Sequence, residues 1–243
     1  MNGFSKKIYL SLKMPSEEMA ISDEKRIKLA LETLGYQNVT IPLTVLQQLY
    51  PLCRNADFDI TVALVHRETD WILVSAESGD TTNEHYGLAV DYGSTTIIMQ
   101  MVDINSGTVI DEVKAVNGQA RYGSDILTRI TYAMEDSTHV DHLQKSTVDN
   151  FNDLLNQLTI NTGIPASSCP VMILSGNTTM IHFLLKLDAW TVFASPYAPV
   201  VTDPGFFPGE ELGLTFSGMV YIVPAASNYI GGDIIRKLLL KIL

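Results

Sequence analysis

The segment of residues 86–116 constrains the fold of this chain more than any other. It contains three apolar stretches of strand length, at residues 87–91, 97–102 and 108–116. A loop of Gly, Ser and Thr joins the first stretch to the second, and residues 103–107 have the composition of a tight hairpin turn. The pattern therefore predicts an antiparallel meander of three strands whose first connection is rich in glycine and hydroxyl groups.

This first connection has the residues of a phosphate-binding loop. Gly93 lets the backbone turn sharply and approach a phosphate closely. Hydroxyl and backbone N–H donors for phosphate oxygens come from Ser94, Thr95 and Thr96. The carboxylate of Asp91 would repel phosphates unless a cation lies between them, so we predict that Asp91 holds Mg²⁺ through water. A hairpin whose polar residues only face solvent is the alternative. The order of strands and loop, which opens the actin-like ATPase fold, favours phosphate binding.

A second loop, residues 175–179, leaves a buried strand and begins a helix. Backbone N–H groups at such a helix start point beyond the end of the strand. In a parallel α/β arrangement the first loop lies on the same side, so Gly176, Asn177 and Thr178 are predicted to contact the same nucleotide. A capped helix start without a ligand is the alternative that the sequence leaves open.

A third strand-to-helix connection, residues 228–233, is also rich in glycine. Gly231 and Gly232 are therefore further candidates for nucleotide contact. Asp233 either caps its helix or orients a water molecule or a metal ion. Capping is favoured, because aspartate commonly has that role at a helix start.

Two charged residues flank the start of a helix predicted over residues 124–134. Either Arg121 meets a phosphate or carboxylate and Asp125 an attacking group, or the segment is a solvated turn that caps the helix. Ser124 is the expected N-cap. His182 lies in an apolar helical pattern and is predicted to be a packed core residue.

Charge and composition exclude several classes of function. The formal net charge of −11 and a pI near 4.8 argue against a nucleic-acid binder, which needs a basic face, and against anionic membrane surfaces. No apolar run approaches the roughly 20 residues of a membrane span, and residues 1–8 lack a signal-peptide core, so a cytoplasmic protein is expected. Cys53 and Cys169 have no disulfide or metal-ligand spacing and are predicted to be free thiols.

The pattern divides the chain into two predicted domains, residues 1–84 and residues 85–243, because residues 78–85 contain no apolar side chain. The first is predicted to contain a strand, two helices and a hairpin, at residues 7–13, 22–34, 43–52 and 59–76. The second continues after the meander with helices at residues 124–134, 140–158, 180–187 and 233–243 and strands at residues 171–174 and 219–223. The last helix ends on an apolar face without a cap, so we expect the chain to be part of a longer protein.

Several segments together resemble the reductive activators of corrinoid proteins, also called corrinoid activation and regeneration proteins. The N-terminal part, with residues 21–26 in its first helix, resembles the linker or middle domain that precedes the ATPase part in that family. The segments that carry the resemblance in the second part are residues 86–96, 121–126, 176–180, 196–200 and 228–234.

The resemblance implies an α/β protein, in which a small α+β linker or middle domain precedes the first half of an actin-like, ribonuclease H-like ATPase domain. Members of the family use ATP with Mg²⁺ to drive reduction of Co(II) to Co(I) in a corrinoid protein, the electron passing through an iron–sulfur cluster. A corrinoid protein is therefore the expected partner, and a ferredoxin-type electron donor and a second copy of the chain are further candidates. The first phosphate loop of the family would be Asp91, Gly93, Ser94, Thr95 and Thr96.

The chain departs from the family pattern in two respects. No iron–sulfur domain is recognisable in it, so the cluster would lie in a separate or missing domain. The second phosphate loop and the adenosine pocket of the family would lie beyond Leu243, so the isolated chain is expected to be inactive. A small-molecule kinase of the same superfamily and a half-domain without catalytic activity are the alternatives.

Overall fold

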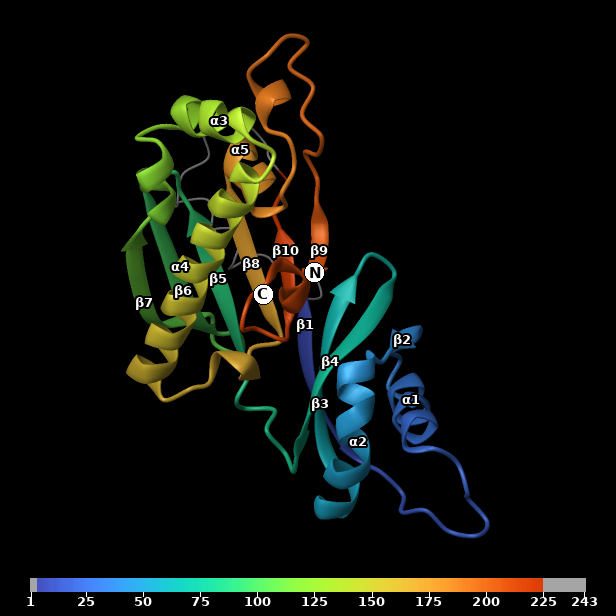
Figure 1. Cartoon of the computed structure of the whole chain (residues 1–243). Helices are drawn as coiled ribbons and strands as arrows, with labels where there is room; N and C mark the ends of the chain where they lie inside the picture. Colours follow the sequence, from blue (N-terminus) through green and yellow to red (C-terminus); the bar gives the residue numbers. More distant parts are fainter. Residues whose placement is uncertain (1–3, 225–243) are drawn as a thin grey trace.

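Two β-sheets form the frame of the protein, one within residues 5–78 and the other within residues 86–222 (Figure 1). The computed structural model describes residues 4–224. The first sheet has the strand order β1-β3-β4-β2, and the second has the order β7-β6-β5-β8-β10-β9.

The first unit packs two helices on one face of its sheet (Figure 1). Ser22 caps α1 by accepting a hydrogen bond from the Lys25 N–H, and Asp23 and Glu24 place negative charge in the first turn. Its elements are β1 (Ser5–Ser11), α1 (Asp23–Thr33), β2 (Val39–Thr40), α2 (Leu43–Asn55), β3 (Asp59–Arg67) and β4 (Asp70–Ser78). The predicted helices and the β3–β4 hairpin are confirmed, whereas β1 begins two residues earlier than predicted.

The second unit begins with the predicted meander, which is confirmed: β5, β6 and β7 pair antiparallel in sequence order. β8 then pairs parallel with β5, and β10 pairs parallel with β8. The strands are β5 (Tyr86–Tyr92), β6 (Thr96–Asp103), β7 (Thr108–Val116), β8 (Val171–Gly176), β9 (Gly205–Pro208) and β10 (Met219–Ile222). The helices are α3 (Ile126–Glu135), α4 (His139–Thr162) and α5 (Thr178–Leu184), with short 3-10 turns η1 (Gly118–Tyr122), η2 (Ala166–Ser168), η3 (Trp190–Val192) and η4 (Gly209–Leu212).

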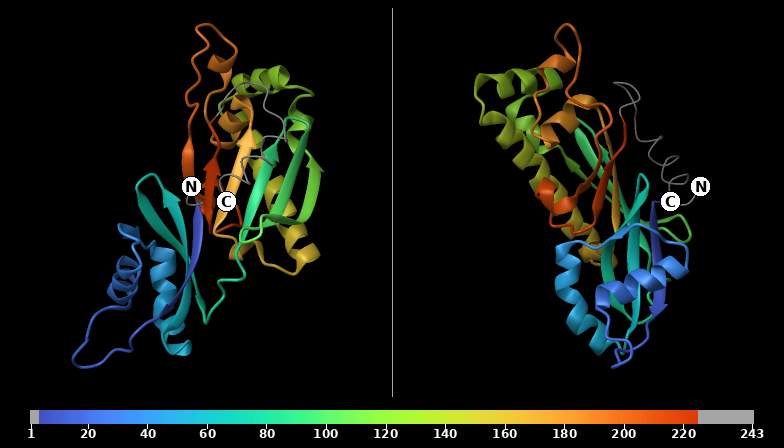
Figure 2. Two further views of the ribbon diagram at one scale, coloured as in Figure 1. Left: turned by 180° about the vertical axis from the view of Figure 1, so that it is seen from behind. Right: turned by 90° about the vertical axis from the view of Figure 1, so that its right-hand side faces the viewer.

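The three helices of this unit cover one face of the six-stranded sheet (Figures 1 and 2). Val90 and Leu174 of the sheet pack against Phe151 and Leu155 of α4 in one apolar cluster. α4 ends where Gly163 adopts a left-handed conformation, four residues beyond the end of the helix predicted over residues 140–158.

One expectation for this unit is wrong. Ser124 does not cap α3; Asp125 does, because its carboxylate reaches the Thr128 N–H at 2.9 Å while the Thr128 hydroxyl accepts from the Asp125 N–H. The connection over residues 195–209, which is rich in proline and glycine, contains β9, a strand that was not predicted. A strand that begins with glycine and ends with proline gives little sequence signal, and proline is tolerated there because β9 is at the edge of the sheet.

The two sheets share a buried apolar contact. Val65 and Ile72 of the first sheet cluster with Val171 and Met219 of the second. Ser5 of β1 lies 2.9 Å from the ring of buried His85, which precedes β5. Within residues 4–224, no helix has the length and apolar character needed to cross a membrane.

Candidate functional site

Asp91 and Ser175 are register partners in the parallel pair of β5 and β8. Parallel strands in register end at the same sheet edge and direct paired side chains to the same face. The loops after β5 and β8 therefore leave one edge of the sheet, as the sequence predicts. β10 ends at this edge too, since Ile222 pairs with Leu174. The connection that carries Gly231, Gly232 and Asp233, and the helix predicted after it, lie outside the described residues.

Asp91 supplies an unpaired carboxylate at this edge. Its side chain is half-buried, and no Lys, Arg or His of the part of the chain that the structure describes lies within ion-pair distance of it. Burial raises the pKa of Asp91 above its usual value, because the charged form loses hydration. A carboxylate in this environment fits a cation. Residues 4–224 hold no group of three or more acidic, His or Cys side chains placed as metal ligands. Within this part of the chain Asp91 is therefore the candidate ligand, and water or substrate would complete its share of the coordination.

The loop from Gly93 to Thr96 leaves several donors unused. The backbone N–H groups of Ser94 and Thr95, and the hydroxyls of Ser94, Thr95 and Thr96, have no hydrogen-bond partner among the described residues. A side chain at Gly93 would place its Cβ 2.5 Å from the carbonyl oxygen of Thr96, so only glycine fits this turn. The loop is closed tightly around its own backbone and presents its donors outward.

The loop after β8 has features of both predicted alternatives, a capped helix start and a set of free backbone donors. Asn177 caps α5, because its side-chain oxygen accepts a hydrogen bond from the Met180 N–H at 2.9 Å. The side chain of Thr178 is buried, and a Cβ at Gly176 would lie 3.1 Å from the Tyr92 carbonyl oxygen. These side chains therefore have structural roles, while the backbone N–H groups of Asn177 and Thr178 have no partner in residues 4–224.

Asn117 is a residue of this site that the sequence did not reveal. It is fully buried, its side-chain nitrogen donates to the carbonyl oxygen of Gly93 at 2.9 Å, and its backbone N–H donates to the carbonyl oxygen of Thr95 at 2.9 Å. Its side-chain oxygen accepts from the Gln119 N–H at 3.0 Å. The only sequence signal is an Asn-Gly pair after a strand, which suggests a turn and does not identify a partner 24 residues away.

Tyr92 connects the same loop to α4. Its hydroxyl lies 2.5 Å from the Thr147 hydroxyl, and the Gln119 side-chain nitrogen lies 3.1 Å from the Tyr92 oxygen and 2.9 Å from the Thr147 oxygen. All three side chains are buried, and burial raises the pKa of the Tyr92 phenol well above its usual value. Tyr92 is therefore a neutral part of the core, on the sheet face opposite to Asp91.

The remaining candidates have structural roles. Arg121 is exposed and donates to the Gly118 carbonyl oxygen, with no carboxylate partner among the described residues. Asp125 is the cap of α3, which lowers its pKa through the hydrogen bond from the Thr128 N–H. His182 is a packed core residue, as predicted: its ring nitrogens bond to the Thr178 carbonyl oxygen at 2.7 Å and the Val200 N–H at 3.1 Å.

Both cysteines are free and buried, as predicted. Burial raises the pKa of the Cys53 thiol, and it raises the pKa of Cys169 to about 12, so both thiols are protonated at neutral pH. Cys53 and Cys169 pack in the apolar cores of the first and the second unit, respectively.

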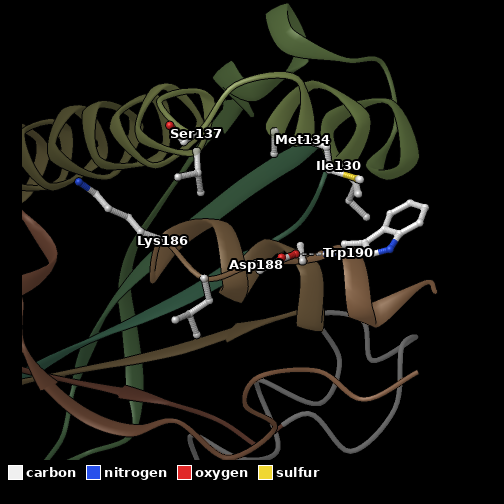
Figure 3. Close-up of a pocket in the computed structure, with 10 residues that line it drawn as sticks. Ile130, Met134, Ser137, Lys186, Asp188 and Trp190 are labelled. Atoms are coloured by element: carbon white, nitrogen blue, oxygen red, sulfur yellow. Dashed lines mark hydrogen bonds between the residues drawn. The ribbon is translucent and has the colours of Figure 1, made fainter. Parts of the chain in front are cut away.

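A cavity of about 210 Å³ lies away from these loops, between α3, the start of α4 and the segment that ends in η3 (Figure 3). Met134, Lys186 and Trp190 are among its lining residues, and the Asp188 carboxylate accepts a hydrogen bond from the Trp190 N–H at 2.7 Å. None of the loop residues at the strand ends lines it.

Family comparisons agree with this arrangement. Residues 1–83 match the RACo linker region, and residues 86–243 match the RACo middle region, which alone covers more than half of the chain. The chain belongs to the RACo family. The boundary between residues 84 and 85 stays a prediction, because no measurement of independent folding tests it.

Comparison with two relatives of this RACo-family chain shows how much of their length it covers. The corrinoid activation enzyme RamQ of Eubacterium limosum is 25% identical over 156 residues, which are 63% of this chain and 26% of that protein. The solved structure of a reductive activator for corrinoid, iron–sulfur protein is 29% identical and superimposes with a TM-score of 0.82, covering 96% of this chain and 37% of that one. The chain thus spans about a quarter to somewhat over a third of these relatives.

The predicted fold class is confirmed by the second of these matches. The protein is a mixed α/β chain in which a small α+β unit with a four-stranded sheet precedes a unit with a six-stranded sheet. That the second unit is the first half of an actin-like domain stays a prediction. The structural match extends over both sheets, since it covers nearly the whole chain.

Proposed function

We propose that this chain is the ATP-binding portion of an ATP-dependent reductive activator of corrinoid proteins. It would supply one side of the nucleotide site, and the other side would come from further parts of the whole protein. The observation that carries the proposal is the register pairing of Asp91 with Ser175, which brings two loops with unused N–H donors to one sheet edge beside an unpaired carboxylate.

The residues at this edge fit Mg-ATP. Four backbone N–H groups, those of Ser94, Thr95, Asn177 and Thr178, have no partner within residues 4–224, and such donors suit phosphate oxygens. Asp91 would hold Mg²⁺ through water. Bound Mg²⁺ neutralises the phosphate charge, which removes the repulsion that Asp91 would otherwise exert.

Within the whole protein, ATP binding and hydrolysis would drive the reduction of Co(II) to Co(I) in a partner corrinoid protein. The electron would come through an iron–sulfur cluster outside this chain. Such clusters are usually held by four cysteines, and the two cysteines of this chain are buried in separate apolar cores. A reducing compartment such as the cytoplasm suits both a low-potential donor and two free thiols.

The proposal is tested in the full-length protein that contains this chain. Mixed with its Co(II) corrinoid partner, a reductant and Mg-ATP, the wild-type protein is expected to produce the Co(I) absorption spectrum. Asp91→Asn should lower the rate by about a hundredfold, the range of losses typical for a group that stabilises charge at a reacting centre. Asp153→Asn, the same substitution at an exposed position on α4, is the control and should leave the rate unchanged.

ATP-independent reduction by the wild-type protein, or equal rates for the two variants, would contradict the proposal. Phosphorylation of a small molecule without any effect of the corrinoid protein would point to a kinase instead. The isolated 243-residue chain should bind Mg-ATP at least about a hundredfold more weakly than the full-length protein, because it supplies only one side of the site.

A further inference from the structure

We infer that Asn117 is the positioning residue of the first loop: it turns two carbonyl oxygens inward so that N–H donors face the ligand. This inference rests on the proposed function and deepens it, because it concerns how the same loop is prepared to receive an anion. Asn117 lies outside the loop in sequence and contacts it at both Gly93 and Thr95.

The argument begins with the geometry of the peptide unit. In a trans peptide, the C=O of one residue and the N–H of the next point in opposite directions. The Gly93 carbonyl oxygen points at the Asn117 side chain, so the Ser94 N–H points away from it. Without the Asn117 side-chain amide, the Gly93 carbonyl oxygen would need another donor, and a loop free to flip this peptide would present a negative oxygen to a phosphate. The backbone N–H of residue 117 holds the Thr95 carbonyl oxygen.

Asn117 is itself held by its neighbours. The next residue, Gly118, donates its N–H to the Asn150 side-chain oxygen of α4 at 2.7 Å. A Cβ at Gly118 would lie 2.6 Å from the Ser146 hydroxyl oxygen, so η1 packs directly on α4. Gln119 adds hydrogen bonds from its side-chain nitrogen to the Thr147 hydroxyl and the Leu143 carbonyl oxygen, at 2.9 and 3.0 Å. α4 therefore fixes η1, and η1 fixes the loop.

The geometry also explains why asparagine is required. Its amide donates to the Gly93 carbonyl oxygen and accepts from the Gln119 N–H at the same time. Aspartate keeps the acceptor but places a second oxygen against the Gly93 carbonyl oxygen. Asn117→Asp thus hardly changes the shape of the side chain, but it turns the attractive contact with the Gly93 carbonyl oxygen into a repulsive one.

The test compares Asn117→Asp with Asn105→Asp in the full-length protein. Asn105 is the matched control, because its side-chain amide also donates to a backbone carbonyl oxygen, that of Thr82 at 3.0 Å, in an exposed turn remote from the loop. The dissociation constant of Mg-ATP is measured by calorimetry. Amide hydrogen exchange is measured in the free protein at position 117, whose backbone N–H donates to the Thr95 carbonyl oxygen of the loop. Asn117→Asp should weaken Mg-ATP binding at least about tenfold, equivalent to about 1.4 kcal/mol, and speed exchange at this loop contact.

Each result decides a different point. Equal affinity and equal loop exchange in Asn117→Asp and the wild type would overturn the role of Asn117 while leaving the proposed function intact. Failure of the wild-type protein to bind Mg-ATP would overturn the proposed function, and the ligand-directed role of Asn117 with it. If Asn117→Asp does not fold, Asn117→Ser replaces it, since serine can still cap the Gln119 N–H but is too short to reach the Gly93 carbonyl oxygen.

Discussion

Asp91 and Ser175 point to the same face of the sheet from neighbouring parallel strands, although 84 residues separate them in the sequence. The carboxylate of Asp91 is half-buried there without a cationic partner among the residues described. Such a group destabilises the free protein and becomes favourable when a cation binds.

The first prediction concerns the loss of stability that the half-buried Asp91 carboxylate causes in the free protein. Burial raises the pKa of Asp91 in the folded state above its unfolded value, so the ionised carboxylate lowers the free energy of unfolding at pH values above that folded pKa. Without Mg²⁺, Asp91→Asn should therefore raise the melting temperature at pH 7, by roughly 2 °C for a domain of this size. The gain should shrink as the pH falls and Asp91 becomes protonated. A melting temperature lower than that of the wild type would show that Asp91 is already stabilised in the free protein.

The second prediction concerns the tight turn at Gly93. Gly93→Ala places a methyl group 2.5 Å from the Thr96 carbonyl oxygen, so the backbone must move and Mg-ATP affinity should fall at least about tenfold. Gly163→Ala is the control, because the left-handed conformation of Gly163 at the end of α4 makes alanine costly by about 1 kcal/mol without touching the loop. Calorimetric titration of both variants with Mg-ATP separates a change in the loop from a general loss of stability. Equal affinities of Gly93→Ala and the wild type would mean that the loop tolerates a side chain.

The third prediction concerns the buried cluster beneath the loop. Tyr92→Phe removes the hydroxyl that bonds to Thr147 and Gln119, and should lower the free energy of unfolding by about 1 kcal/mol in urea. Thr147→Val should cost a similar amount. The double variant should cost less than the sum, because both single changes break the same hydrogen bond. Strict additivity would show that the two hydroxyls do not interact.

The fourth prediction concerns His85, between the two sheets. Burial is the main cause that lowers the pKa of His85, to about 4, and the nearby Lys7 and Lys6 lower it further. The folded state therefore binds fewer protons than the unfolded state. The contribution of neutral His85 to the free energy of unfolding is fully present above pH 6.5 and is lost as the pH falls towards 4.

In urea titrations, His85→Gln should remove most of this dependence, which amounts to about 3 kcal/mol. His142→Gln, at an exposed histidine of α4, should leave the dependence unchanged. A wild-type stability that is constant between pH 6.5 and 4.5 would mean that His85 accepts its proton without loss of packing.

The sequence predicted the meander and its loop because both depend on local patterns: alternation in the strands, glycine at the turn, and hydroxyls beside it. It also placed the loops of Gly93 and Gly176 at one edge, since parallel strands must end together. It could not reveal Asn117, whose role depends on a contact made only in the folded chain. For the same reason, the sequence could not decide that Asn177 caps α5 with its side chain.

The burial of Arg129 could not be predicted from the sequence, for a different reason. Arginine is usually exposed, yet this side chain is 1% exposed, bonds to the Gly123 carbonyl oxygen at 3.0 Å and contacts the Met180 sulfur. Burial lowers the pKa of its guanidinium, although the group stays charged. Composition and spacing carry no information on such a placement, which follows from the packing of α3 against α5.

The apolar contact between the two sheets has a mechanical consequence. Val65 and Ile72 are packed against Val171 and Met219. The Phe4 ring of the first unit meets Phe206 of the second edge-on and Tyr221 at a tilt, with ring centroids 5.4 and 4.7 Å apart. Any rotation of the six-stranded sheet must either carry the four-stranded sheet with it or expose these side chains to water.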